Sequence, residues 1–434
     1  MSVESLTRRL ARLVRARDVT SPDLVAAERY VRDWLGSYVA GTASPTGRRL
    51  RSYARGARDL EERVFLAAAL SHVTETDDLH GASVTHPGCV VIPVALLLGR
   101  RRRVRGHALL GGTLAGYEVM TRIGEALGPA HYRTFHNTAT AGVFGAAATA
   151  AYLLGLDEDA WVWALGSAGT QAAGLWQFNE EGAMSKPLHA GHAAAAGLRA
   201  ALLAAEGLTG AEAILEGEKG LFRALCPDAR PDAVLAESPG WKLPETSMKP
   251  YPCCRHVHPA IDAALELRNT IPSAEPARIR IETYPAALDL TDRPHPRSPE
   301  EARFSIQYAV VTALLRGRPG LEAFEAAAVL DPALHDALAR TTVESNAALA
   351  AAYPKRWGAR VVVETTGGVQ QRAERDGATG DPDVPLDDPM LDAKVRGLFA
   401  WAGLPEAEGT ELLRACRHLA SNGPPFALPV GPDA

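Results

Sequence analysis

Carboxylates and histidines gather in one short segment of the chain, residues 75–86. Its ionisable side chains are Glu75, Asp77, Asp78, His80 and His86. The segment lies between two apolar stretches that we expect to be helices, so these side chains share one loop. Histidine titrates near neutral pH and carboxylates exchange protons, which suits general acid/base catalysis; carboxylates also suit metal binding. The alternative is a charged helix end followed by the cap of the next helix.

Two polar loops further along the chain each precede an Ala-rich helix. The first loop contains Arg133 and His136; taken alone, His136 would be a helix cap or a core histidine. The second loop ends in the Lys-Pro pair that begins at Lys186. Proline fits the first turn of a helix, where the backbone amides and the dipole favour an anion. Because the lysine adds a full positive charge there, we predict that Lys186 binds an anion and that this anion is the substrate.

Two more segments carry polar side chains that suit a binding site. Residues 249–258 supply four of them: Lys249, Cys254, His256 and His258. The two adjacent cysteines in this segment cannot easily ligate one iron–sulfur cluster together. Tyr308 stands at the predicted start of a later helix, where a tyrosine taken alone is more often a core or capping residue.

The sequence predicts neither a metal nor an organic cofactor. His189 and His192 lie three positions apart on one helix face and can ligate a metal, but no third ligand of known spacing accompanies them. Iron–sulfur spacings are missing, and so are the dinucleotide, Walker and nucleophile-elbow motifs. The absence of these motifs argues against nucleotide cofactors and against serine hydrolysis.

The elements that must position these residues are mostly helices. Apolar residues recur at helical spacing through the first 245 residues, with no strand-like alternation. The predicted helices there include Ser21–Val39, Asp59–His72, Val90–Gly99, Gly106–Leu127, Thr138–Leu154 and Lys186–Ala205. Strict alternation predicts strands later in the chain, at Ala277–Tyr284, Ala359–Thr366 and the hairpin partner Gly368–Glu374. Further helices are expected at Phe304–Arg316, Leu321–Leu330, Pro389–Trp401 and Pro405–Ser421.

This order of elements predicts a mainly α protein with two domains. A discontinuous all-helical domain takes residues 1–247 and, with a C-terminal tail, residues 389–434. A smaller α+β domain, residues 248–388, interrupts it.

Composition narrows the function classes. The 434 residues are 47% hydrophobic and carry a net charge of −5, so no overall basic field recruits nucleic acid or membrane. The arginine cluster at 100–105 is most simply a solvated turn. Residues 137–156 are uncharged and long enough to cross a bilayer, but too rich in Ala, Gly and Thr, so we predict a buried helix there. No signal peptide is visible, and an odd number of cysteines, five, favours a reduced cytoplasmic protein.

Taken together, the motifs resemble the MmgE/PrpD family. The matching stretches are ETDDLH and THPG within 75–88, FHNTATAGVFG at 135–145, ALGSAGTQAAGL at 164–175, GAMSKPLHAG at 182–191, KPYPCCRHVHPAID at 249–262 and FSIQY at 304–308. They cover nearly the whole chain in the order of the family. The resemblance implies a helical domain interrupted by an α+β lid, and a homodimer.

The resemblance also implies the site residues. Those expected to be catalytic are Glu75 or Asp77, His86, His136, Lys186 and Tyr308. Those expected to bind substrate are Asp78, Arg133, Lys249, Cys254, His256 and His258. Leu79 departs from the family pattern, where many members have threonine, and Trp176 and Phe178 are bulky; these changes point away from methylcitrate and aconitate as substrates.

The implied activity is that of a cofactor-independent lyase, a dehydratase acting on a small polycarboxylate. A base, His86 or His136, removes the proton α to a carboxylate, and Tyr308 or the other histidine protonates the leaving hydroxyl. Lys186 and Arg133 bind carboxylates and stabilise the developing charge. The alternatives are an epimerase or isomerase, a decarboxylase on a similar substrate, and a carboxylate-binding protein without catalysis.

Overall fold

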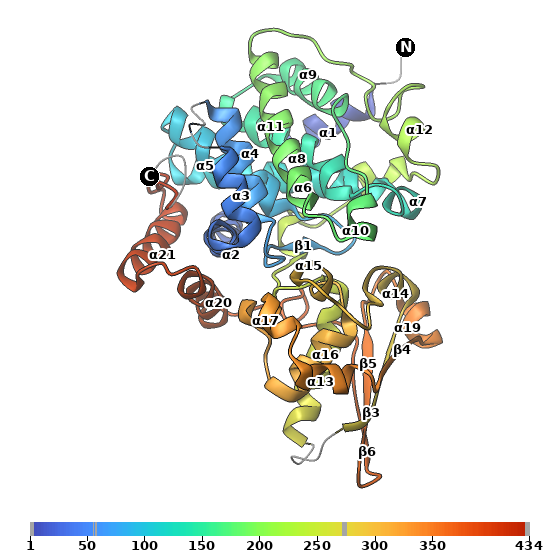
Figure 1. Cartoon of the computed structure of the whole chain (residues 1–434). Helices are drawn as coiled ribbons and strands as arrows, with labels where there is room; N and C mark the ends of the chain where they lie inside the picture. Colours follow the sequence, from blue (N-terminus) through green and yellow to red (C-terminus); the bar gives the residue numbers. More distant parts are fainter. Residues whose placement is uncertain (1–3, 55, 57–58, 271–275, 430–434) are drawn as a thin grey trace. The chain divides into compact units, whose positions relative to one another are not determined.

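The computed structural model describes residues 4–54, 56, 59–270 and 276–429 of the chain. They fall into two compact units. The helical unit consists of the residues up to Val73, of Asp77–Ser247 and of those from Met390 on; the α+β unit consists of Thr74–Thr76 and Met248–Pro389. Helices dominate the first unit and one four-stranded sheet marks the second (Figure 1), so the predicted mainly α fold is confirmed.

The helices of the helical unit follow one another along the chain, except that the last two come after the α+β unit. They are α1 (Leu6–Arg15), α2 (Ser21–Ala43), α3 (Pro45–Tyr53), α4 (Leu60–Ser71), α5 (Pro87–Arg102), α6 (Gly106–Ala126), α7 (Pro129–Tyr132), α8 (Asn137–Leu154), α9 (Glu158–Gly169), α10 (Gln177–Glu181), α11 (Lys186–Ala205), α12 (Leu221–Leu225), α20 (Asp388–Trp401) and α21 (Glu406–Ala420). Several begin at side-chain caps that the sequence signals. Asp59 accepts a hydrogen bond from the first turn of α4, and Thr20 forms a capping box with Asp23 at α2.

Helix α8 forms the centre of this unit, packed against α5, α6, α9 and α11. Small residues allow the close approach. A Cβ atom added at Gly197 of α11 would lie 2.3 Å from the carbonyl oxygen of Val143 on α8, closer than any real contact. The predicted buried helix is therefore confirmed. The Ala and Gly content that made it a poor bilayer span also allows α6 and α11 to approach its backbone.

A network of buried charges joins α2 to the two C-terminal helices. Lys394 on α20 donates to Asp33 on α2 at 2.5 Å, with both side chains buried. Arg32 on α2 bridges Asp392 at 2.8 Å and Glu28 at 3.1 Å. Helix α21 packs on α2 and α6, so residues from the two ends of the chain share one core.

Two expectations about local structure were wrong. A two-residue strand, β1 (Leu79–His80), lies within the region expected to contain no strand and pairs antiparallel with β2 (Thr246–Ser247). The predicted helix at 321–330 is broken into the 3₁₀ turn η4 (Leu321–Phe324) and α17 (Ala326–Val329), because Glu325 adopts an extended conformation between them.

The α+β unit is built on a four-stranded sheet in the order β4-β3-β5-β6. Its strands are β3 (Pro276–Thr283), β4 (Thr341–Ser345), β5 (Ala359–Thr365) and β6 (Gln370–Arg375). Strands β3, β5 and β6 pair antiparallel and confirm the predicted strands and hairpin. The fourth strand, β4, runs parallel to β3 and was missed, because its residues TTVES are short, polar and mostly exposed.

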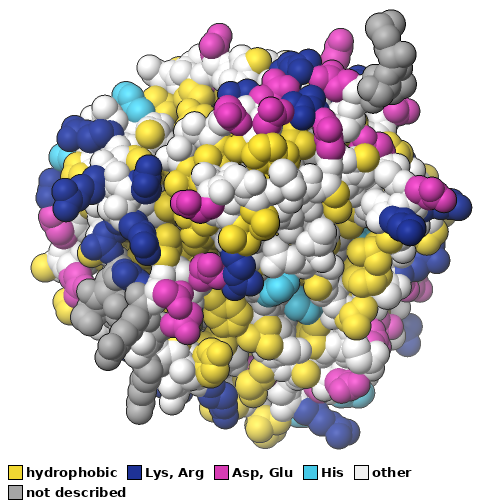
Figure 2. Space-filling model, turned by 90° about the horizontal axis from the view of Figure 1, so that it is seen from above, with side chains coloured by type: hydrophobic (Ala, Val, Ile, Leu, Met, Phe, Trp, Pro, Cys, Tyr) yellow, Lys and Arg dark blue, Asp and Glu magenta, His cyan; other side chains and the backbone are white. Residues whose placement is uncertain are grey.

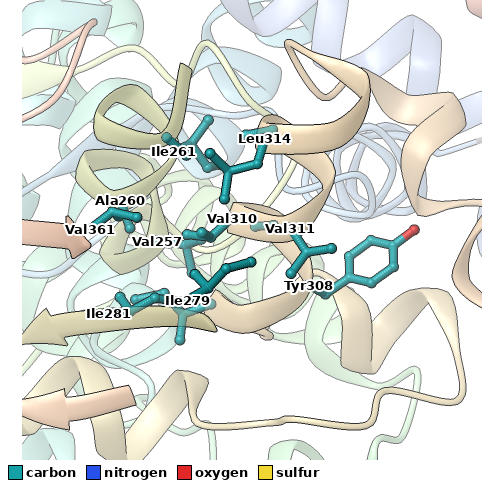
Figure 3. Packing of buried hydrophobic residues seen from close by; sticks show 14 of the residues in the cluster. Val257, Ala260, Ile261, Ile279, Ile281, Tyr308, Val310, Val311, Leu314 and Val361 are labelled. Carbon is teal, nitrogen blue, oxygen red and sulfur yellow. The ribbon is translucent and has the colours of Figure 1, made fainter. Parts of the chain in front are cut away.

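Helices cover this sheet and supply its core. They are η3 (Arg255–Val257), α13 (His258–Thr270), α14 (Pro285–Thr291), α15 (Pro299–Ala302), α16 (Ile306–Arg316), α18 (Pro332–Leu338) and α19 (Ala347–Ala352). Helix α13 packs on β5, β6 and α16. Figure 3 shows side chains of β3, such as Ile279 and Ile281, meeting Val257 and Val310 between the helices and the sheet.

The surface carries both signs of charge. On the face shown in Figure 2, acidic and basic side chains stand among exposed apolar atoms. Across the described part of the chain, no helix combines the length and apolar character that a bilayer crossing requires.

Candidate active site

A buried carboxylate between two histidines forms the centre of the candidate site, within the helical unit. His72 ends α4, His86 stands directly before α5, and Asp77 lies in the loop between these helices. Oδ2 of Asp77 lies 2.6 Å from Nδ1 of His72 and 3.3 Å from Nδ1 of His86. Burial opposes ionisation of Asp77, but the two histidines outweigh it and hold the pKa of this carboxyl well below its usual range.

The backbone fixes the tautomer of His86. Its Nδ1 lies 2.6 Å from the carbonyl oxygen of Asp78, and because a carbonyl can only accept, Nδ1 must carry a proton. In the neutral ring, Nε2 is then the unprotonated nitrogen. The backbone amide of His86 donates to Thr138 at 3.1 Å, which ties the start of α5 to α8. His86 is therefore held in the tautomer that a general base requires.

Asp78 holds this loop in place. One carboxylate oxygen accepts the hydroxyl of Tyr117 at 2.5 Å, and the other accepts the amide of Gly88 at 3.0 Å. Burial raises the pKa of Asp78 to about 7, against the hydrogen bond from Tyr117 that lowers it. Both oxygens accept hydrogen bonds from the protein's own donors, and the predicted contact between Asp78 and substrate stays a prediction.

A second pair of histidines joins α8 to α11. Nδ1 of His136, the residue before α8, lies 3.1 Å from Nδ1 of His189 on the first turn of α11. The ring of Trp176 packs against His136 with 4.7 Å between ring centres, and Phe178 meets His189 edge-on at 5.3 Å. These aromatic side chains hold both imidazoles in fixed orientations.

Lys186 starts α11, as predicted, and is 8% exposed. Its positive charge acts on both histidines of the second pair. Burial is the first cause that lowers the pKa of His136 well below its usual range, and Lys186 is the second. The pKa of His189 falls to about 4 through burial and then through the charges of His72 and Lys186. The positive charge of Lys186 repels a proton on either histidine. The same charge attracts a bound anion.

The two pairs form one cluster. The rings of His72 and His136 are stacked with centres 5.6 Å apart, and those of His86 and His136 lie 6.2 Å apart. Four imidazoles, one carboxylate and one ammonium thus share a small volume of the helical unit. Such an arrangement can bind a carboxylate and exchange protons at more than one point around it.

His72, Asp77 and His86 are close enough to share a metal ion. Ligands 2.0–2.1 Å from tetrahedral zinc stand about 3.3 Å apart. The 2.6 Å between Nδ1 of His72 and Oδ2 of Asp77 is instead the length of a charge-assisted hydrogen bond. His72 and Asp77 therefore have the geometry of a hydrogen bond, while Nδ1 of His86 lies 3.3 Å from the same carboxylate oxygen.

His80, from the same acidic loop, is directed to another cluster. Its Nε2 lies 3.8 Å from Glu125 and 3.7 Å from Glu245. Lys242 binds both of these carboxylates at 3.1 Å. His80 thus belongs to an ion-pair network near the end of α6.

Glu75 belongs to the α+β unit, where it pairs with Lys249. The ammonium of Lys249 lies 3.0 Å from Oε2 of Glu75, and both side chains are buried. Glu75 has a φ angle of +57°, in the left-handed region that residues other than glycine seldom adopt. The two predicted residues are brought together as a buried ion pair.

Other predicted residues of the α+β unit lie in its interior. Nδ1 of His256 contacts the hydroxyl of Tyr284 at 2.6 Å, and its ring stacks on Trp357 at 4.3 Å. Burial, with Arg255 and Lys249 nearby, lowers the pKa of His256 to about 3. His258 contacts the carbonyl of Cys253 at 3.2 Å, and the amide of Cys254 donates to Arg303 at 2.8 Å. Their predicted contacts with substrate stay predictions.

Tyr308 lies inside the α+β unit, and its predicted role as an acid stays a prediction. It is fully buried on α16 and packs against Phe324; Figure 3 shows its ring beside Val311. Its hydroxyl donates to the carbonyl of Ala323 at 2.5 Å, and burial raises its pKa. The hydroxyl proton is engaged inside the unit, so the core alternative for Tyr308 describes its position. Arg133 is exposed at the end of α7, and its predicted carboxylate contact stays a prediction.

Sequence reasoning missed two members of the cluster. His72 was taken only as the end of a helix, and His189 only as half of a metal pair. The spacing of His72 five residues before Asp77, just past an apolar helix, was a usable signal. For His189, the signal was its place one turn after Lys186, on the same face of α11.

Comparisons with known proteins place this geometry in context. The MmgE/PrpD N-terminal domain matches residues 8–233, and the MmgE/PrpD C-terminal domain matches residues 251–418. The chain is 28% identical over 382 residues to a cis-aconitate decarboxylase of Homo sapiens, covering 79% of this chain and 77% of that protein. It is 30% identical over 226 residues to the cis-aconitate decarboxylase-like protein oryM of Aspergillus oryzae, covering 48% of this chain and 46% of that protein.

Proposed function

The chain belongs to the MmgE/PrpD family, and from this premise we propose that it is a cofactor-independent lyase acting on a small carboxylate. One observation carries the proposal: four histidines and Asp77 lie together beside the buried ammonium of Lys186. Relatives named cis-aconitate decarboxylase support a substrate that bears a carboxylate.

In the proposed reaction, Lys186 binds a carboxylate of the substrate. The ammonium stabilises the negative charge that builds up on this carboxylate when the neighbouring carbon loses its proton. His86 is a suitable base because Nδ1 donates its proton to the carbonyl of Asp78, so the neutral ring carries its lone pair on Nε2. Asp77, ionised between His72 and His86, stabilises His86 once it is protonated.

The acid is the other histidine, His136, in place of Tyr308. The hydroxyl of Tyr308 is engaged with Ala323, whereas His136 lies in the same cluster as His86 with ring centres 6.2 Å apart. Two histidines on different elements can act on two positions of one substrate. Loss of a hydroxyl group from the neighbouring carbon makes the reaction a dehydration of a hydroxy-polycarboxylate.

Decarboxylation is the second candidate, since the relatives are named as decarboxylases. It uses the same carboxylate site and delivers a proton to the carbon that loses CO₂. Epimerisation or isomerisation uses the same proton exchange without elimination. A carboxylate-binding protein without catalysis would need none of the four histidines to exchange protons.

One experiment separates these reactions. The purified protein is incubated in deuterated buffer containing EDTA with a panel of hydroxylated and unsaturated di- and tricarboxylates, followed by proton NMR and by CO₂ detection. Dehydration gives a new vinyl signal without CO₂, decarboxylation gives CO₂, and epimerisation gives deuterium at the α carbon of an otherwise unchanged skeleton. Absence of turnover and exchange with every carboxylate of the panel, despite binding, would favour the non-catalytic alternative.

We further propose that the enzyme acts as a homodimer in the cytoplasm. The Ala-rich, weakly charged helices and the family resemblance support dimerisation, and five buried thiols suit a reducing compartment. Light scattering should give a mass of about twice the 46.1 kDa of the chain. A monomer at micromolar concentration would contradict this assignment.

A further inference from the structure

The 3.1 Å contact between Nδ1 of His136 and Nδ1 of His189 restricts where protons can sit. Two nitrogens at this distance form a hydrogen bond only if one carries a proton and the other a lone pair. We propose that His189 relays protons between solvent and His136, so that His136 stays neutral when it gives up a proton as the acid. The relay rests on the proposed function for its substrate, but the hydrogen bond that it requires exists in the protein alone.

The surroundings keep the pair neutral, which the relay needs. His136 is faced by His72, His86 and Lys186, and His189 is faced by His72, Lys186 and His192. Burial and these charges lower the pKa of both rings, that of His189 to about 4. Near pH 7 each ring therefore holds one proton. With one proton between the two Nδ1 atoms, the rings must be opposite tautomers.

Burial gives the relay a direction. His136 is 1% exposed, whereas His189 is half-buried on the first turn of α11. A proton on the buried ring has no direct access to water, but its neighbour has a face toward solvent. The pair therefore connects the interior of the cluster to the surface.

The backbone near Gly174 is built to allow this contact. The amide of His136 donates to the carbonyl of Gly174 at 2.8 Å, and Gly174 has a φ angle of +108°. A Cβ atom added there would lie 2.4 Å from Cβ of Ala139 and 3.4 Å from Nδ1 of His189. Any other residue would strain the backbone and crowd the helix beside the histidine pair.

At the start, His136 carries its proton on Nε2 and His189 carries its proton on Nδ1. The C–O bond of the substrate breaks, its electron pair stays on oxygen, and the Nε2 proton of His136 binds this oxygen to form water. The Nδ1 proton of His189 crosses to Nδ1 of His136, and a proton from solvent water binds Nε2 of His189. Both rings end neutral with their tautomers exchanged. The reverse transfer, begun when Nε2 of His136 takes up a proton from water after the product leaves, restores the starting tautomers.

The first test needs no substrate. Long-range proton–nitrogen NMR of protein labelled with ¹⁵N-histidine distinguishes protonated from unprotonated ring nitrogens, and single variants assign the signals. We expect His136 and His189 to carry their protons on opposite nitrogens, and the His192→Gln control to leave this pattern unchanged. If both rings carry the proton on Nε2, no proton lies between the Nδ1 atoms and the proposal is overturned.

The second test uses His189→Asn, which places an amide group near the position of Nδ1. It can still donate a hydrogen bond to His136 but cannot carry a proton onward near neutral pH. With a carboxylate that the wild-type protein turns over, we expect turnover to fall at least about tenfold while solvent deuterium exchange at the α carbon is kept, since a positioned proton-transfer group contributes about 10²–10⁴. A defect in packing alone would lower exchange and turnover together.

The outcomes separate the two proposals. If His189→Asn keeps the wild-type ratio of exchange to turnover and the wild-type pH profile, the relay is wrong and the proposed function stands. If the wild-type protein exchanges no proton with any carboxylate of the panel, the proposed function fails, while the tautomer measurement still decides whether the histidine pair shares a proton. Thermal unfolding of His189→Asn and His192→Gln shows whether the fold is kept.

Discussion

The ammonium of Lys249 lies 3.0 Å from Oε2 of Glu75, in the interior of the α+β unit. The two residues are 174 positions apart in the chain, so their contact attaches the three-residue segment Thr74–Thr76 to this unit. Removing one partner of a buried pair leaves the other charge without its counterion and costs about 3–5 kcal/mol. We expect Lys249→Met to lower the free energy of unfolding by about that amount in urea titrations.

The double variant Lys249→Met, Glu75→Gln provides the control for this pair. It removes both charges, so it should recover most of the lost stability. A loss of under about 1 kcal/mol in the single variant would show that the pair contributes little to the fold.

Lys186→Met should separate binding of the substrate carboxylate from folding. Methionine keeps the length of the side chain but removes its charge. A charge-assisted hydrogen bond to a desolvated carboxylate is worth about 1.5–3 kcal/mol, so kcat/KM should fall by about tenfold to a hundredfold while the melting temperature changes little. Lys219→Met, at an exposed position, is the matched control. An unchanged kcat/KM in folded Lys186→Met would exclude the assigned role.

His86→Gln and His136→Gln should each lose one proton-transfer step. Glutamine keeps a polar side chain but cannot carry a proton near pH 7. In deuterated water we expect deuterium incorporation at the carbon α to the carboxylate to fall by about 10²-fold or more in His86→Gln, and turnover to fall by about as much in His136→Gln. Exposed His295 gives the control variant His295→Gln. Wild-type exchange in His86→Gln together with wild-type turnover in His136→Gln would move the acid/base role to Glu75, Asp77 or Asp78.

The free energy of unfolding should decrease as pH is lowered, over a pH range set by the buried histidines. The pKa values of His136, His189 and His256 are lowered in the folded protein, that of His189 to about 4 and that of His256 to about 3. The unfolded chain therefore binds protons near pH 6.5 that the folded chain refuses. Each such group reduces the unfolding free energy by at most about 1.4 kcal/mol per pH unit as pH falls below 6.5 toward its folded pKa.

The variant His256→Asn tests this linkage. Its amide keeps a polar group near the hydroxyl of Tyr284 but does not titrate, so the slope of unfolding free energy against pH between 6.5 and 4 should be shallower than in the wild-type protein. Equal slopes in the two proteins would mean that His256 contributes nothing to the pH dependence.

Much of the helical unit could be predicted from sequence, because its signals are local. The Lys-Pro pair predicted the start of α11, and the helix predicted from Asp59 corresponds to α4, which Asp59 caps in the structure. Strand β4 could not be predicted in this way, since its residues are polar and its pairing with β3 depends on a distant part of the chain.

The sequence predicted which residues belong to the site better than it predicted the contacts between them. His86 and Lys186 were expected from their motifs, and the structure brings both to one cluster. The contact of His136 with His189 depends on how α8 packs on α11, and the engagement of Tyr308 with Ala323 depends on the fold of the segment after α16. Neither relation leaves a periodic or spacing signal in the sequence.

The ion pair between Asp33 and Lys394, 361 positions apart, has a consequence for synthesis of the protein. At about 5–20 residues per second, α2 leaves the ribosome roughly 20–70 seconds before α20 does. During that interval the apolar face of α2 and its buried carboxylate lack their final partners, while most of the α+β unit is translated as one continuous segment. The helical unit can therefore be completed only after α20 and α21 are made, and a chain stalled before α20 leaves the surface of α2 that these helices cover without its partners.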